Sequence, residues 1–364
     1  MSKFASYTST LSNQEYSTYA RHLILSNVGI NGQKKLKNLK VLIIGAGGLG
    51  SPAMLYLVTA GVGYIGIIEN DTIDVSNLNR QILYNRTEIK KPKIYTAKQK
   101  LTKINPYCKI ITHAYKLNKI NASSIIKYYH IIIDCSDNFN TRYISNTICY
   151  QLHKIYIYGG IQKFEGQIAI FNYQNGIKYD DIYPRNLKLN NNNLCNENGL
   201  LGVITGTIGI LQATETLKIT LGIGYFADNH ILIYNLLFSS FKKIQIYPSK
   251  NLLYNYLPKN ETKYTHNHLI ISNNQLDYIK DKQIKKTILI DIRDNIIFTN
   301  NKTNKKKVIN IPWSYLHLHH TIQFLKEYHK EKVLVIYCNT VYRSLLISNI
   351  FKYYKIKHYI LALS

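Results

Sequence analysis

The chain has 364 residues, a length that predicts two or three domains rather than one. Its hydrophobic content of 46% is enough for real cores, and no uncharged apolar run reaches the roughly 18 residues that a membrane-spanning helix needs. The formal net charge of +26 would ordinarily indicate a nucleic-acid partner.

A skew in residue usage explains the positive charge better than a nucleic-acid partner does. Ile, Asn, Lys and Tyr are all heavily used, with 32 Tyr against 1 Trp, and all four have AT-rich codons. The lysines then read as scattered, solvated surface residues. We therefore expect no nucleic-acid partner and no membrane, although a basic surface could steer an acidic protein partner.

The start of the chain bears on where the protein works. The first 15 residues are rich in Ser and Thr, but they lack an apolar signal core and lead almost directly into the fold. We expect no long cleaved transit peptide. With the AT-biased residue usage, this favours an organelle-encoded protein of the plastid (chloroplast) stroma. The alternative is the cytoplasm of a bacterium with an AT-rich genome.

The five cysteines are spread along the chain and form no C-x-x-C pair. Neither a zinc cage nor a disulfide framework is indicated, and a reducing compartment fits best. The five are Cys108, Cys135, Cys149, Cys195 and Cys338.

Short apolar runs alternate with helical stretches over the first part of the chain. Such runs are typical of parallel strands that are buried on both faces, and the segments between them can supply crossover helices. We expect a doubly wound, mostly parallel α/β sheet of the Rossmann-like kind. The expected strands are 41–44, 65–69, 109–113, 130–135 and 155–158.

The remainder of the chain divides into smaller pieces. Residues 174–200, with four successive asparagines, are expected to be irregular, and 206–221 to form a helix. Residues 231–235 and 241–247 are expected to close the sheet as an antiparallel pair. The predicted domains are 11–247, a linker at 248–268, and a second, smaller α/β unit at 269–364, which contains strands at 287–291 and 333–337.

A glycine turn follows the first expected strand and opens a helix from about residue 51. In this turn Gly45, Gly47, Gly48 and Gly50 can let a phosphate approach a helix N-terminus, where backbone N–H groups are free. An ordinary dinucleotide fold accounts for this turn equally well. Glu69 ends the second strand 19 residues past Gly50, where an acid can bind ribose hydroxyls, although it can also be a plain exposed strand-end acid.

Two cations beyond the second strand carry more information than the turn. Arg80 and Lys93 stand 13 residues apart, and together they can bracket a triphosphate and stabilise the charge that develops when a phosphoryl bond breaks. A plain NAD or FAD site does no chemistry on its phosphates and needs no such pair. The sequence therefore predicts an enzyme that activates a substrate with ATP.

An acidic turn ends the fourth expected strand. Strand carboxyl ends line the ligand crevice of an open parallel sheet, so Asp137 could hold Mg²⁺ on the phosphates. The alternative for Asp137 and Asn138 is capping of the helix expected at 139–150, and both roles are compatible.

These motifs together resemble the ubiquitin-activating-enzyme superfamily, and within it the molybdopterin-synthase adenylyltransferases and their thiamine-pathway relatives. The resemblance covers about 11–247 and rests on the segments 45–50, 76–81, 92–93, 135–138 and 205–217. It implies a nucleotidyltransferase that uses ATP to adenylate the C-terminal glycine of a small ubiquitin-like sulfur carrier ending in Gly-Gly, in molybdenum cofactor biosynthesis. A thiamine-pathway or tRNA-thiolation carrier remains an alternative substrate.

The resemblance also implies individual roles. Gly48 would lie under the phosphates, Glu69 would meet the ribose, and Asp137 would bind Mg²⁺. Asn77, Arg80 and Lys93 would contact the phosphates. Arg21 would reach the ATP of the partner subunit in a homodimer, although it also reads as an ordinary surface arginine. The implied nucleotide-binding set is Arg21, Gly45, Gly47, Gly48, Gly50, Glu69, Asp71, Ser76, Asn77, Leu78, Asn79, Arg80, Lys93, Asp137 and Asn138.

Two positions depart from the family pattern. The family usually has Asp where Glu69 stands, and we expect altered nucleotide affinity rather than lost activity. Many members hold zinc with two C-x-x-C pairs, but the corresponding segments 179–184 and 254–259 contain no cysteine. We therefore expect no zinc site.

Two further cysteines are candidate nucleophiles. Cys195, in the expected irregular segment, could be a thiolate that handles an acyl or sulfur intermediate, as in related proteins, or it could be inert. Cys338 is followed by four residues and then Arg343, which resembles a rhodanese active loop; the motif at 290–294 also fits such a domain. The loop lacks glycine and the tail stops short of the family's usual end, so a buried structural cysteine is the alternative.

These features predict a second step after adenylation. A persulfide on Cys338, loaded by a sulfur donor such as a cysteine desulfurase, would attack the acyl-adenylate. Cys195 would then resolve the acyl disulfide and release a thiocarboxylate. Fusion of the two domains motivates this sulfurtransferase step, because it raises the effective concentration of the sulfur donor.

Overall fold

The structure is a computed structural model, and it describes residues 10–174, 176–184, 199–225, 229–247, 270–272, 275–277, 287–293, 308–312, 316, 319–338 and 341–361. The chain forms two compact units. The first comprises residues 1–178 and 190–243, and the second residues 179–189 and 244–364. The linker predicted at 248–268 lies outside the described residues, and the domain bounds stay a prediction.

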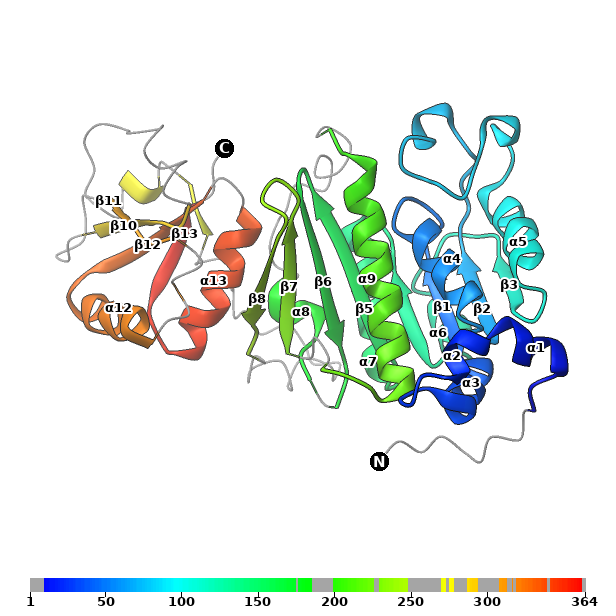
Figure 1. The fold of residues 1–364 in the computed structure, drawn as a ribbon. Helices are drawn as coiled ribbons and strands as arrows, with labels where there is room; N and C mark the ends of the chain where they lie inside the picture. The colour runs from blue at the N-terminus through cyan, green and yellow to red at the C-terminus, as the bar shows by residue number, and fades with distance from the viewer. Residues whose placement is uncertain are drawn as a thin grey trace. The chain divides into compact units, whose positions relative to one another are not determined.

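The first unit is built on an eight-stranded sheet, with the order β3-β2-β1-β4-β5-β6-β7-β8 (Figure 1). Strands β3 to β5 are parallel, which confirms the predicted doubly wound arrangement. From β5 to β7 the sheet continues antiparallel. The bounds are β1 (Lys40–Ile44), β2 (Tyr64–Ile68), β3 (Lys109–His113), β4 (Ile131–Asp134), β5 (Ile155–Gln162), β6 (Glu165–Phe171), β7 (His230–Asn235) and β8 (Ser240–Gln245).

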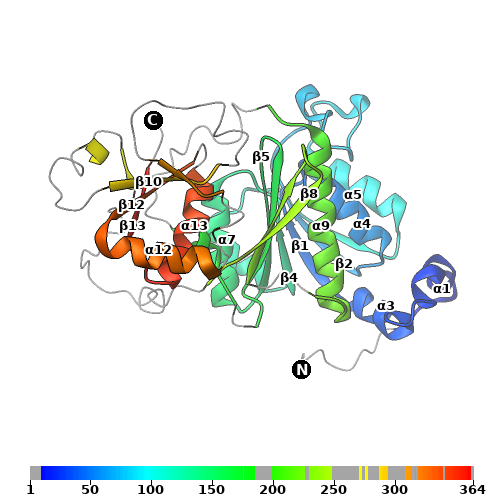
Figure 2. The same cartoon turned by 60° about the vertical axis from the view of Figure 1, so that its left-hand side comes forward.

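Helices cover both faces of this sheet (Figures 1 and 2). On one face α4, α5 and α9 pack side by side, and on the other α6 packs against α7. Three short helices precede the sheet. The bounds are α1 (Asn13–Thr18), α2 (Ala20–Leu23), α3 (Gly29–Asn38), α4 (Gly50–Thr59), α5 (Lys93–Ile104), α6 (Ala122–Ile126), α7 (Phe139–Gln151) and α9 (Gly202–Leu221).

The central strands are apolar because both of their faces are covered. Val41, Leu42 and Ile43 on β1, and Ile65 and Ile67 on β2, have no exposed surface. Each such side chain contributes about 1.5–3 kcal/mol when fully removed from water. This burial fixes the register of β1 between β2 and β4, and with it the place where the glycine turn leaves the sheet.

Three cysteines are part of this core. Cys108, Cys135 and Cys149 are all buried. Burial raises the pKa of Cys108 to about 12 and also raises the pKa of the other two thiols. At neutral pH all three are protonated and unreactive.

The second unit contains a smaller sheet that is parallel throughout, with the order β11-β10-β12-β13-β9. Its described helices are α12 (His319–Glu331), α13 (Val341–Tyr353) and the single turn α8 (Tyr179–Ile182), which packs on α13. The strand bounds are β9 (Ile270–Ile271), β10 (Thr287–Asp291), β11 (Val308–Asn310), β12 (Val333–Tyr337) and β13 (His358–Leu361). Within the described part of the chain, no helix is long and apolar enough to cross a membrane.

Candidate active site

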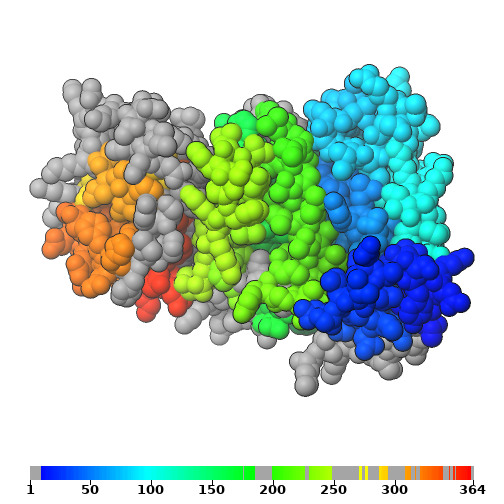
Figure 3. All heavy atoms as spheres, viewed as in Figure 1, coloured from blue at the N-terminus to red at the C-terminus, as the bar shows by residue number. Residues whose placement is uncertain are grey.

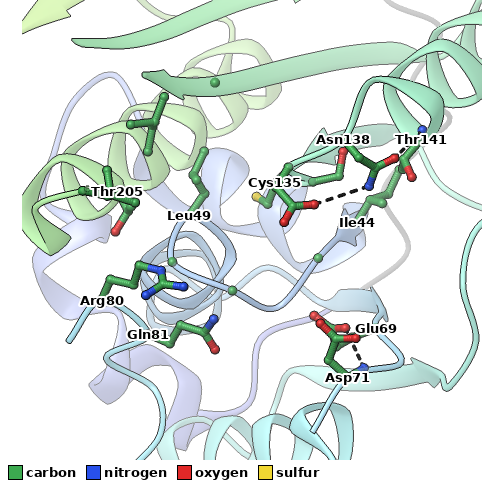
Figure 4. A pocket seen from close by; sticks show the side chains of 18 of the residues that line it. Ile44, Leu49, Glu69, Asp71, Arg80, Gln81, Cys135, Asn138, Thr141 and Thr205 are labelled. Carbon is green, nitrogen blue, oxygen red and sulfur yellow. Dashed lines mark hydrogen bonds between the residues drawn. The ribbon is translucent and has the colours of Figure 1, made fainter. Parts of the chain in front are cut away.

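A cavity of about 560 Å³ opens at the carboxyl ends of β1, β2 and β4 in the first unit. Its size suits a small-molecule ligand. The lining comes from the glycine turn, the segment after β2, the end of β4, the β5–β6 turn and the start of α9. Figure 4 shows these segments facing one another across the cavity.

The glycine turn follows β1 directly and begins in a conformation that favours glycine. Gly45 has a φ of +97°, and a Cβ there would lie 3.0 Å from the carbonyl oxygen of Cys135. At Gly50, a Cβ would lie 2.1 Å from the carbonyl oxygen of Gly45. No other residue fits these two positions without moving the backbone. Gly45, Gly47 and Gly48 line the cavity, whereas Gly50 begins α4 behind it.

Glu69 ties the end of β2 to this turn. One carboxylate oxygen, Oε2, accepts from the Ala46 N–H at 2.9 Å. The other, Oε1, accepts from the N–H groups of Asn70 and Asp71 at 2.8 and 2.9 Å. Glu69 also lines the cavity, and its contact with the ribose of ATP stays a prediction.

Both predicted cations reach the cavity. Arg80 lines it, with its Nη1 donating to the Ser76 carbonyl at 2.8 Å and to Asn79 Oδ1 at 3.0 Å. Lys93 begins α5 and is only 5% exposed, while its Nζ lies 3.5 Å from an oxygen of the exposed Asp71. A buried ammonium with one distant partner is costly unless an anion joins it. The cavity can accept such an anion.

The segment before Arg80 builds the turn that carries it. Asp74 and Asn77 form a reciprocal cap around the 3-10 turn η1 (Val75–Asn77), and Ser76 also donates to Asp74. Ser76, Asn77 and Leu78 do not line the cavity, whereas Asn79 does. Contacts of these four residues with ATP stay predictions.

The end of β4 supplies a carboxylate to the same cavity. Asp137 is exposed and lines it, and Asn138 both lines it and caps α7 by accepting from the Thr141 N–H at 2.9 Å. Of the two roles considered for this turn, the capping of α7 is therefore observed in Asn138, and the binding of Mg²⁺ by Asp137 stays a prediction.

The buried carboxylate of Asp134 stabilises this turn through hydrogen bonds. It is buried and accepts from Ser136 N, Ser136 Oγ and the Tyr156 hydroxyl at 2.8, 2.6 and 2.6 Å. Burial raises its pKa, and the nearby Arg142 charge and these hydrogen bonds partly oppose that rise. Its observed role is to hold the turn that presents Asp137.

Four helices point their N-termini at the cavity or its rim. They are α4, α5, α7 and α9, and the last of these has 20 residues. A Cβ on Gly48 would lie 2.9 Å from Thr205 Oγ1, and one on Gly202 would lie 2.2 Å from the Asn79 carbonyl oxygen. The start of α9 therefore packs directly on the glycine turn and on the segment carrying Arg80. In the space-filling view, α9 (green) lies against blue and cyan parts of the first unit (Figure 3). Helix N-termini favour anions, so their sum favours a polyanion.

Several lining residues do not emerge as candidates from the sequence. They are Gln81, Lys116, Arg142, Lys163 and Thr205. Gln81 belongs to the run 76–81 and Thr205 to the segment 205–217, and both segments are motifs on which the family resemblance rests. The motifs therefore pointed to these two residues without giving either of them a role. The other three lie in turns and a helix whose approach to the cavity depends on the tertiary fold.

Other predicted site residues lie elsewhere. Arg21 is exposed on α2 and does not line the cavity. Cys195 lies outside the described residues. Cys338, in the second unit, follows β12 and is 2% exposed, and the backbone of Arg343 belongs to α13.

The site around Cys338 is held by a buried ion pair. The Arg293 guanidinium binds the Asp291 carboxylate through two nitrogens and lies 4.9 Å from the centre of the Tyr337 ring. Among the described residues, no three His, Cys, Asp or Glu side chains gather as a metal site. Of the two segments that correspond to the zinc ligands of the family, 179–184 is described and 254–259 is not, so the expected lack of zinc stays a prediction.

Comparisons with known proteins agree on one family. The ThiF family model matches residues 19–254. A protein of Gracilaria tenuistipitata var. liui, named "Probable molybdopterin-synthase adenylyltransferase", is 43% identical over 97% of this chain and 98% of its own length. A Mycobacterium tuberculosis protein, "Probable adenylyltransferase/sulfurtransferase MoeZ", is 39% identical over 65% of this chain and 62% of its own. The crystal structure of E. coli MccB with ATP shares the fold, with a TM-score of 0.56 at 21% identity over 67% of this chain and 83% of that one.

The bridge made by Glu69 can be tested by shortening it. In Glu69→Asp the carboxylate cannot reach both Ala46 N and the N–H groups of Asn70 and Asp71. Losing one such bond should lower the free energy of unfolding by about 1–2 kcal/mol. Urea unfolding followed by circular dichroism measures this, and an unchanged free energy would contradict the bridging role.

Proposed function

The chain belongs to the ThiF family, and from that premise we propose that it adenylates the C-terminal glycine of a small ubiquitin-like sulfur carrier in molybdenum cofactor biosynthesis. The protein is thus an ATP-dependent nucleotidyltransferase. One observation carries the proposal. A single cavity brings together the glycine turn, Arg80, Lys93 and the N-termini of four helices. Two cations and several helix N-termini at one cavity favour a polyanion such as a triphosphate.

The first step follows from this arrangement. The triphosphate of ATP lies on the glycine turn, and the ribose hydroxyls face Glu69. A carboxylate oxygen of the carrier attacks the α-phosphorus, and the bond from that phosphorus to the α–β bridging oxygen breaks. Pyrophosphate leaves with the bonding electrons, and the acyl-adenylate remains. Arg80 and Lys93 stabilise the charge that gathers on the phosphate oxygens during this transfer.

Asp137 would hold Mg²⁺ on the phosphates. Its exposed carboxylate lines the cavity, and oxygen ligands together with substrate phosphates are what this ion prefers. When bound, the ion neutralises charge on the leaving pyrophosphate.

More than one class of carrier protein fits this chemistry. The likeness to a molybdopterin-synthase adenylyltransferase over nearly the whole chain supports the molybdenum pathway. The alternative is the same chemistry on a thiamine-pathway or tRNA-thiolation carrier. For location we propose the plastid stroma, or else the cytoplasm of a bacterium with an AT-rich genome, on the strength of the residue usage alone.

ATP–pyrophosphate exchange tests the adenylation step and identifies which class of carrier is the substrate. We expect exchange with a molybdopterin-type carrier, and little with thiamine-type or tRNA-thiolation carriers assayed side by side. Arg80→Ala should reduce exchange at least about 100-fold, because a charge-stabilising group at the phosphates is lost. Chelation of divalent ions should stop exchange, and added Mg²⁺ should restore it.

Arg86→Ala is the matched control for that experiment. Arg86 is an exposed arginine six residues from Arg80, and it does not line the cavity. Its removal should leave exchange near the wild-type level. Exchange that survives Arg80→Ala, or that is absent with every carrier, would refute the proposed chemistry.

We further propose that the second unit delivers sulfur. A persulfide on Cys338, loaded by a donor such as a cysteine desulfurase, attacks the acyl carbon and expels AMP, leaving an acyl disulfide. The Cys195 thiolate attacks the Cys338 sulfur of that disulfide and releases the thiocarboxylate. The resulting Cys195–Cys338 disulfide is reopened by a cellular dithiol reductant. Supporting this, Cys338 directly follows β12 and precedes the 13-residue helix α13, whose N-terminus favours an anion.

Replacing Cys338 separates the two steps. Cys338→Ala should keep ATP–pyrophosphate exchange, because adenylation takes place in the first unit. It should lose thiocarboxylate formation when a cysteine desulfurase supplies the sulfur, measured by the mass of the carrier. Buried Cys149→Ala is the control and should retain both activities. An unchanged yield in Cys338→Ala would refute the sulfur-transfer proposal.

We also propose a homodimer in which Arg21 reaches the ATP of the partner subunit. The exposure of Arg21 on α2, away from the cavity of its own chain, supports this arrangement.

Mixing two defective variants tests the dimer. Arg21→Ala and Lys93→Ala should each be inactive as pure proteins. Co-expressed in equal amounts they should regain about a quarter of the wild-type exchange, because half of the dimers are mixed and each mixed dimer has one intact site. No recovery from two folded variants would contradict action across the dimer.

A further inference from the structure

Lys163 has a backbone conformation that favours glycine. Gln162 pairs with Glu165 across β5 and β6, so Lys163 and Phe164 alone form the turn between these strands. Lys163 has a φ of +54°, whereas the φ of Phe164 is not positive. A two-residue turn with a positive φ at its first position favours glycine there, because a Cβ is strained in this region. Such strain persists where the surrounding structure enforces it, and it is concentrated at functional sites.

The position of Lys163 in the site agrees with a functional role. Eight non-glycine residues of the described chain have a positive φ, and Lys163 is the only one of the eight that lines the cavity. Its side chain is exposed, and no acid or carbonyl group of the described residues binds its ammonium. The ammonium is therefore available to an anion at the rim of the cavity.

The strand before this turn forms a wall of the cavity. Tyr158 pairs with Asp134 at the end of β4, and β5 then continues for four more residues, Gly159–Gln162. Residues 160–163 line the cavity from this extension. In the sheet, β5 is three strands away from β2, which corresponds to about 14 Å. The turn with Lys163 therefore lies far from Glu69, where the ribose is predicted to bind.

The proposed reaction needs a cation at such a place. Its nucleophile is a carboxylate, which must approach a triphosphate of the same charge. Arg80 and Lys93 are predicted to bind the phosphates, so neither is free to neutralise this second anion. A lysine ammonium has three donors and can pair with a carboxylate in several orientations. Lys163 is suited to this task because it reaches the cavity from a different wall.

The surroundings of Lys163 fit a protein substrate. The Leu236 N–H donates to the Phe164 carbonyl at 2.9 Å, so the β7–β8 turn lies beside the β5–β6 turn. Phe164, Leu237 and Phe238 are all exposed on these two turns. Exposed apolar side chains gathered in one place mark sites of protein interaction. The chemistry of this rim, one free cation beside apolar side chains, suits the carboxylate end of a protein chain.

We propose that Lys163 binds the C-terminal carboxylate of the carrier protein and holds it for attack on the α-phosphorus of ATP. This inference rests on the proposed adenylation, and it names the residue that recognises the second substrate. Arg80 and Lys93 stabilise the phosphates, whereas Lys163 selects a chain that ends in a free carboxylate. Lys163 stays protonated throughout, and the bonds that form and break are those of the adenylation step.

Combining a protein variant with a carrier variant tests this contact. Wild type and Lys163→Met are each titrated by calorimetry, without ATP, with a molybdopterin-type carrier that ends in either a carboxylate or a carboxamide. Wild type should bind the carboxylate form about 10- to 100-fold more tightly, as expected for a hydrogen bond between charged groups. Lys163→Met should bind both forms equally, because methionine keeps the length of the side chain but not its charge.

Lys90 provides the matched control, because it is exposed and has a φ of +68° but does not line the cavity. Lys163→Gly and Lys90→Gly should both raise the midpoint of urea unfolding, since glycine relieves the same strain. Only Lys163→Gly should lose the preference for the carboxylate.

Three results would overturn the inference and leave adenylation standing. They are equal binding of both carrier forms by wild type, a carboxylate preference that survives in Lys163→Met, and a loss of ATP affinity in Lys163→Met without carrier. The last of these would place the ammonium on a phosphate instead. A wild-type protein that catalyses no ATP–pyrophosphate exchange with any carrier would overturn both the inference and the proposed function.

Discussion

The backbone of Ala46 is held by hydrogen bonds at both its N–H and its carbonyl group. Its N–H is bound by the Glu69 carboxylate and its carbonyl by the Tyr84 hydroxyl, at 2.9 Å in each case. Glu69 directly follows β2, and Tyr84 belongs to the segment that carries Arg80. The two bonds therefore lock the glycine turn to both elements that surround the expected phosphates. A site that stabilises charge in a transition state must be preorganised, because it gains nothing from groups that reorient during the reaction. The remaining features of the cavity depend on this fixed turn.

Helix α9 adds a third support. Its first turn packs on Gly48 and on the backbone of Asn79, so the longest helix of the first unit directs its positive end at the same place. Lys93 is buried at the start of α5 and carries its charge into a low-dielectric setting, where it acts more strongly on an anion than it would at the surface. The excess positive charge of the whole chain is a separate matter, because a basic surface can steer an acidic protein partner toward the molecule.

Much of this architecture is predictable from the sequence, for identifiable reasons. Fully buried parallel strands read as continuous apolar runs, and a glycine turn between a strand and a helix is typical of a phosphate site. Strand β6, by contrast, has no such signal, because Glu165, Gly166 and Gln167 interrupt its apolar pattern while tertiary packing still buries them. Helix α9 begins at Gly202, ahead of the predicted start at 206, since its first turn owes its helical form to packing on the segment after β2. The bridging role of Glu69 likewise needs the distance from β2 to the turn.

In the proposed reaction the α-phosphate of ATP, and not the γ-phosphate, is transferred to a carrier carboxylate. To test this, the enzyme and a Gly-Gly-ended carrier are incubated with ATP that is radiolabelled either at the α-phosphate or at the γ-phosphate. The protein is then separated by rapid gel filtration, and the label bound to it is counted. We expect label from the α-phosphate to stay with the enzyme–carrier complex, while label from the γ-phosphate leaves as pyrophosphate. Retention of the γ-label on protein, or release of both labels with a carrier that binds, would contradict it.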